Sequence, residues 1–135
     1  MQKDTLAGVK AGVIVGLLES ILWAISFFLS ASDVISTLIL SPTMQILVGV
    51  VFASSTVGGA IFGYAYTRLQ AKIPISSLYL KAGVFGVCVW VIPPLASWLL
   101  AGDGRPPLDS VLGGLGAIIF SYLFNKWAKT GQVAK

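Results

Sequence analysis

Long apolar runs separated by short polar segments dominate this chain of 135 residues. Hydrocarbon about 30 Å thick takes about 20 residues of helix at 1.5 Å each. Four runs reach that length, and we expect helices at about residues 11–30, 42–67, 78–100 and 108–127. Because the runs are continuous rather than alternating, they favour an all-α polytopic membrane protein over a β-barrel.

The ends of these runs carry further signals. Ser41 and Pro42 before the second run are typical of a helix N-cap followed by the first helical position. The first run resembles a signal peptide, but its apolar core exceeds the usual length of about 7–15 residues, so we expect a retained helix. Residues 33–40 are too short to span. They fit a brief interfacial helix capped by Ser32 or Asp33, or an apolar loop over the bundle.

Composition and charge indicate the solvent and the orientation. Hydrophobic residues make up 56% of the chain and charged residues 10%, against about 25% charged in soluble domains, which excludes a soluble enzyme. Only Arg105 among the basic residues lies on the side of the membrane that holds the connection between the third and fourth runs. The others lie on the opposite side, around the start of the first run, the junction of the second and third, and the end of the fourth: Lys3, Lys10, Arg68, Lys72, Lys81, Lys126, Lys129 and Lys135. This asymmetry predicts that both termini of a multi-pass membrane protein lie in the cytoplasm. Anionic lipid accounts for the net charge of +4, so we expect no nucleic-acid partner.

Metal and cofactor chemistry has little support in the sequence. The chain contains no histidine and a single cysteine, Cys88. Haem, zinc and iron–sulfur centres draw their protein ligands mainly from these two residue types. We therefore expect no cofactor, no metal site and no intrachain disulfide.

Two pairs of similar segments indicate an internal duplication. Lys10 to Val13 (KAGV) recurs as Lys81 to Val84, and residues 59–64 with Arg68 resemble residues 116–122 with Lys126. Each repeat would then be one helical hairpin, and both would have the same orientation. The alternative is a chance match between helices rich in glycine and alanine.

Small residues recur at fourth positions along the runs. Membrane helices associate through close packing, so such stripes predict helix-contact faces. The main candidates are Gly12, Gly16, Gly59, Gly63, Gly113 and Gly114. A nucleotide-binding loop is the competing interpretation. It is disfavoured, because the glycines lie inside apolar runs without a following Lys-Ser/Thr.

Pro93 and Pro94 interrupt the third run. Each removes a helical hydrogen bond, which frees the carbonyls of Val89 and Trp90 and predicts a kink. Such a break either lets the helix lean over its neighbours or lines an ion or substrate cavity.

Glu19 is the one charged residue near the middle of a run. It lies nine residues after Lys10, about 13.5 Å along a helix, where an acid costs on the order of 2.5–3.5 kcal/mol. Gly12, Gly16 and Trp23 share its side of the helix. Equal depths on the other spans fall at Gly59, Trp90 and residues 116–117. An ionised Glu19 needs a counter-charge from another subunit, a cation or a substrate. A protonated one needs a serine, a carbonyl or the Trp90 indole.

The KAGV starts, residues 57–63 (VGGAIFG) and residues 89–94 (VWVIPP) resemble uncharacterised glycine-rich four-helix membrane protein families of prokaryotes. That resemblance implies the architecture and no activity. Small multidrug exporters are similar only in layout, four short helices with a glutamate in the first. The unequal distribution of lysine and arginine between the two sides opposes the dual topology of many of these exporters.

Two function classes remain in view. The first is a non-catalytic accessory subunit that packs in the bilayer against other membrane subunits, or against itself, in a larger complex such as an energy-transducing one. The second is a small ion- or proton-coupled transporter or channel that uses Glu19, Trp90, Pro93 and Pro94. A membrane enzyme is disfavoured, because no catalytic constellation accompanies Glu19.

Overall fold

A computed structural model describes residues 2–30, 41–101 and 108–130, and the segment 33–40 therefore lies outside the described residues. The described chain is helical, with four helices long and apolar enough to cross a membrane: Asp4–Ser26, Pro42–Lys72, Leu78–Leu100 and Ser110–Lys129. This confirms the predicted all-α class and the presence of four helices long and apolar enough to span a membrane. Orientation and duplication stay predictions.

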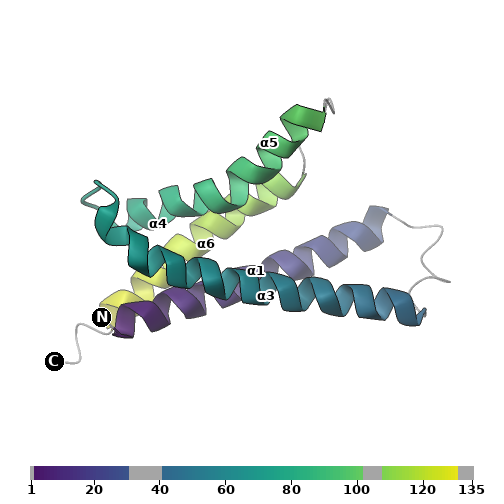
Figure 1. Ribbon diagram of the computed structural model, residues 1–135, viewed down its shortest axis with the longest axis horizontal. Coiled ribbons are helices and arrows are strands. Elements are labelled where there is room, and N and C mark those ends of the chain that lie inside the picture. The colour runs from purple at the N-terminus through teal and green to yellow at the C-terminus, as the bar shows by residue number, and fades with distance from the viewer. Residues whose placement is uncertain (1, 31–40, 102–107, 131–135) are drawn as a thin grey trace.

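The helices follow the predicted runs, with differences at their ends (Figure 1). The elements are α1 (Gln2–Ser30), α3 (Pro42–Leu69), the 3-10 turn η1 (Gln70–Lys72), α4 (Leu78–Gly86), η2 (Val87–Val91), α5 (Ile92–Ala101) and α6 (Leu108–Thr130). The first helix begins nine residues before its predicted start at residue 11. The hydrophobic count stops where polar residues begin, whereas the helix continues past that boundary and buries Ala7.

Serine caps fix two of the helix starts. The Ser41 hydroxyl accepts a hydrogen bond from the Met44 N–H at 3.3 Å, which confirms the predicted N-cap before Pro42. Ser77 does the same for the Leu80 N–H at 3.4 Å. Each cap satisfies one backbone donor that the first helical turn leaves unpaired.

Glycine backbones bring α1 and α3 together. A Cβ added at Gly12 would collide with the Gly59 carbonyl, one at Gly8 with Gly63, and one at Gly16 with Ser55. Only hydrogen atoms fit between these backbones, so the helices approach more closely than larger side chains would allow. The small-residue faces therefore hold the first hairpin together between Gly8 and Gly16 of α1.

The second hairpin pairs α4 and η2 with α6 in a different register. A Cβ at Gly86 would lie 2.7 Å from that of Ala117, and one at Gly113 would collide with the Trp90 carbonyl. Aligning the two proposed repeats on their motifs would pair Gly83 with Gly116, whereas the observed contact joins Gly86 to Ala117. Gly83 instead faces the Ser121 hydroxyl, which donates a 2.7 Å hydrogen bond to the Tyr79 carbonyl.

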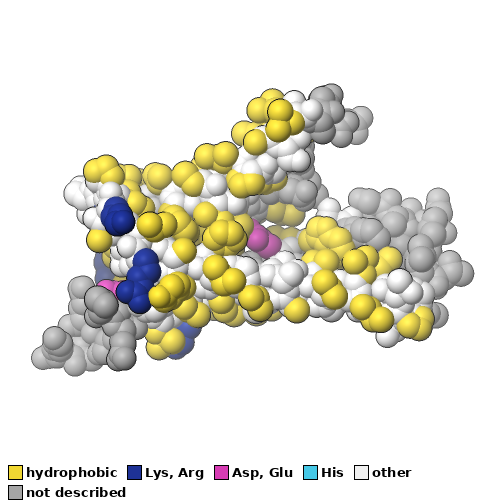
Figure 2. Space-filling view, viewed as in Figure 1, with side chains coloured by type: hydrophobic (Ala, Val, Ile, Leu, Met, Phe, Trp, Pro, Cys, Tyr) yellow, Lys and Arg dark blue, Asp and Glu magenta, His cyan; other side chains and the backbone are white. Residues whose placement is uncertain are grey.

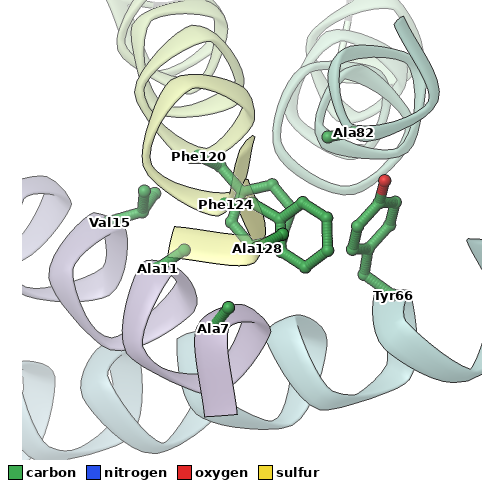
Figure 3. Packing of buried hydrophobic residues seen from close by; sticks show 8 residues of the cluster. All are labelled: Ala7, Ala11, Val15, Tyr66, Ala82, Phe120, Phe124 and Ala128. Carbon is green, nitrogen blue, oxygen red and sulfur yellow. The ribbon is translucent and has the colours of Figure 1, made fainter. Parts of the chain in front are cut away.

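An aromatic core joins the two hairpins (Figure 3). Tyr66 of α3 is fully buried and packs edge-on against Phe124 and Phe120 of α6, with ring centroids 4.7 and 5.4 Å away. Ala7, Ala11 and Val15 of α1 complete the cluster from the other side of α6. The Tyr66 hydroxyl donates to the Leu78 carbonyl at 3.4 Å, so the side chain also ties α3 to the start of α4.

This core lies near one end of the molecule, which we call the basic end because lysine and arginine gather there (Figure 2). Away from the basic end, α5 and the adjoining part of α6 diverge from α1 and α3 (Figure 1). Figure 2 shows the two arms separated at this side, with an acidic side chain at the inner end of the gap. We call this gap the notch.

Candidate functional site

Glu19 lies halfway along α1, at the point where the two arms separate. The Trp90 side chain is a hydrogen-bond partner of its carboxyl group. A Cβ added at Gly116 would lie 2.8 Å from Glu19 Oε1, so the carboxyl group occupies space that this glycine leaves free. The three residues come from α1, η2 and α6. Their positions along the four runs predict the same depth for all three.

A cavity of about 290 Å³ surrounds this carboxyl group at the inner end of the notch. All four spans contribute to its wall: Glu19, Trp23, Val51, Ser55, Val89, Trp90, Pro94, Leu112 and Gly113. Glu19 is the only lining residue that carries a charge when ionised. The cavity is therefore an apolar and aromatic pocket with one carboxyl group, and it can accept hydrogen bonds or bind a cation.

An irregular helix positions Trp90. Residues Val87–Val91 form a π-helix in which the Ile92 N–H binds the Val87 carbonyl, and Pro93 and Pro94 follow in the first turn of α5. The third span therefore contains a π-helix just before the prolines, and the kink expected at Pro93 and Pro94 stays a prediction. The wider π turn rotates the residues that follow it, and such turns are frequent at functional sites.

The cavity unites some of the sequence candidates and leaves others out. Glu19, Trp90, Pro94 and Gly113 line it, whereas Pro93 is exposed and absent from its wall. The contact glycines Gly12, Gly16, Gly59 and Gly63 lie between α1 and α3.

Gly114 does not lie at a helix contact, which corrects the prediction for this residue. A Cβ there would meet nothing within 4 Å. Adjacent helical residues point about 100° apart, so Gly113 and Gly114 cannot both face η2.

Three lining residues carry no sequence signal for this site: Val51, Ser55 and Leu112. No periodicity distinguishes Val51 or Leu112 from other apolar residues, and Ser55 is equally typical of a small-residue helix contact. These positions line a cavity only because the two arms diverge. Hydrophobic patterns do not predict the angle between the arms.

The described residues hold no group of three or more His, Cys, Asp or Glu side chains that could bind a metal ion. One carboxyl group with an indole partner suits ion pairing and hydrogen bonding.

Comparison with known proteins gave no family model, curated protein or solved structure that matches this chain. The resemblance to four-helix families therefore rests on the quoted motifs alone.

Proposed function

We propose that this chain is a non-catalytic subunit of a larger integral membrane complex in a prokaryotic cytoplasmic membrane. The observation that carries the proposal is the notch, where a mid-membrane carboxyl group lies in a cavity between arms that diverge. A protein that works alone in the bilayer would place this group against lipid tails, which cannot hydrogen-bond to it. A neighbouring subunit would cover it.

The distribution of burial supports the same proposal. The aromatic core lies near the basic end, whereas the third span exposes large apolar residues such as Leu99 and Leu100, at 65% and 89%. Small-residue contacts occupy the interior of the first hairpin, so α3 leaves side chains such as Ile46 and Val57 available to other subunits.

Native purification tests this function. The tagged chain, expressed from its own locus and extracted in mild detergent, should elute with other membrane subunits at fixed stoichiometry, as measured by light scattering and mass spectrometry. Recovery of the chain alone, or only as copies of itself, would contradict the proposal.

Orientation is part of the proposal, and both termini are expected in the cytoplasm. In a Cys88→Ser background, a cysteine at Thr43 should react with an impermeant maleimide in intact cells. A cysteine at Lys72 should react only after permeabilisation, because Lys72 lies at the basic end. The reverse pattern would exclude the assignment.

A second candidate is a small ion- or proton-coupled transporter. The observation favouring it is the irregular backbone of η2 beside Glu19, since broken helices at mid-membrane line transport sites. In this case Glu19→Gln should assemble normally in proteoliposomes but abolish ion-coupled flux. Flux that persists in this variant would exclude the candidate.

A further inference from the structure

We propose that the notch receives a transmembrane helix of a partner subunit, and that a lysine or arginine at the middle of that helix pairs with Glu19. This inference rests on the proposed function, because it identifies the chemistry of one subunit in the complex. It concerns the cavity at the inner end of the notch and the separated arms beyond it.

Charge complementarity is the first argument. None of the described residues at the depth of Glu19 is basic, and Lys10, the nearest cation along α1, is about 13.5 Å away at helical rise. Two other cations are engaged elsewhere. The Lys81 ammonium donates to the Gln70 carbonyl at 3.0 Å, and the Arg68 guanidinium lies 5.1 Å from the centre of the Tyr64 ring. The mid-membrane carboxyl group therefore has a hydrogen-bond donor in this chain but no counter-ion at its depth.

The lining of the cavity is the second argument. Trp90 binds the carboxyl group, and Trp23 lines the same space one helical turn along α1. An ammonium or guanidinium group is attracted both by a carboxylate and by the face of an indole ring. A cavity of about 290 Å³ accommodates the end of a long side chain but not a helix about 10 Å wide. The helix itself would lie further out, where the arms are apart.

Depth distinguishes a helix from the other possible occupants. A lipid acyl chain carries no charge at mid-membrane, and its headgroup lies at the interface. A second copy of this chain presents its described lysines and arginines at the basic end, away from the depth of Glu19. Backbone that faces lipid at this depth must be helical to satisfy its own polar groups. A partner helix with one central cation meets all of these conditions.

Synthetic helices provide a direct test. The full chain carries a donor dye on a cysteine replacing Lys129, in a Cys88→Ser background, and is reconstituted in phosphatidylcholine vesicles. Three leucine-rich transmembrane peptides carry an acceptor dye: one with a central lysine, one with that lysine moved about two turns, and one with leucine throughout. Energy transfer is measured against the peptide-to-lipid ratio.

We expect the central-lysine peptide to reach half-saturation at a ratio about tenfold lower than the leucine peptide, the size of polar effects between model membrane helices. Moving the lysine should remove most of this advantage, and Glu19→Gln should abolish it. Gly114→Ala, a change that meets no neighbour, is the matched control and should bind like the parent chain.

Three results would overturn the inference. Equal binding of all three peptides would show that the notch accepts any apolar segment, including lipid, without a requirement for a charged side chain. Glu19-dependent energy transfer between two labelled copies of this chain would show that a second copy fills it. Recovery of an intact native complex with Glu19→Gln would leave the proposed function standing while removing the ion pair.

Discussion

At the scale of single residues, the contact between Glu19 and Trp90 depends on the depth of each residue and on the direction in which each side chain points. Only the depth can be predicted from the sequence. The depth of each residue follows from counting along its helix, and that count brought them to one level. Their facing directions do not follow, because the π-helix at Val87–Val91 changes the rotation of the third span. Sequence patterns therefore supplied the candidates, and the backbone supplied the pairing.

Gly116→Ala should disturb the site while leaving the Glu19 residue unmutated. The added methyl group would lie 2.8 Å from Glu19 Oε1, so the carboxyl group must move away from its present position. We expect destabilisation of about 1–3 kcal/mol, the usual cost of overpacking. Unfolding in mixed micelles measures it.

Gly114→Ala on the same helix is the control for that experiment, since its methyl group would meet nothing within 4 Å. It should keep the stability of the parent chain. Equal stability of both variants would show that Gly116 does not confine the carboxyl group.

At the scale of helices, small residues determine how the first hairpin closes. The stripe of Gly8, Gly12 and Gly16 meets the stripe of Gly63, Gly59 and Ser55 in antiparallel order. This arrangement follows from spacing alone, because residues four apart lie on one face of a helix. The second hairpin lacks a matching pair of stripes, and its shifted register was not predictable from the repeated motifs.

Gly59→Leu should separate α1 from α3, because any side chain there collides with the Gly12 carbonyl. We expect a large loss of folded protein, measured as the monodisperse fraction after extraction in mild detergent. Gly58→Leu adds the same side chain one residue earlier, where a Cβ meets nothing within 4 Å, and should be recovered normally. Similar losses in the two variants would argue against a glycine contact face.

At the scale of the whole molecule, one aromatic cluster joins hairpins that otherwise diverge. Tyr66, Phe120 and Phe124 were not singled out from the sequence, because aromatic residues also occur at lipid-facing and interfacial positions. The number of spans and their approximate limits were predictable, since hydrocarbon thickness fixes them. The angle between the hairpins was not, because it depends on which side chains interdigitate.

Tyr66 allows the contributions of ring and hydroxyl to be separated. Tyr66→Phe keeps the ring and loses the hydrogen bond to the Leu78 carbonyl, which should cost about 1 kcal/mol. Tyr66→Ala empties a fully buried site and should cost about 3–5 kcal/mol. Both values come from reversible unfolding in mixed micelles. A larger loss for phenylalanine than for alanine would be incompatible with this core.

The contact between α1 and α6 also has a consequence for the order of biosynthesis. Ala7, Ala11 and Val15 of α1 lie more than 100 residues before Phe120 and Phe124 of α6, so α1 is synthesised well before the helix it packs against. The first hairpin has its glycine contacts as soon as α3 is made, whereas the alanine face of α1 must wait until α6 has been synthesised. A chain arrested before Leu108 leaves that face uncovered, and incompletely folded chains are triaged by chaperones and proteases.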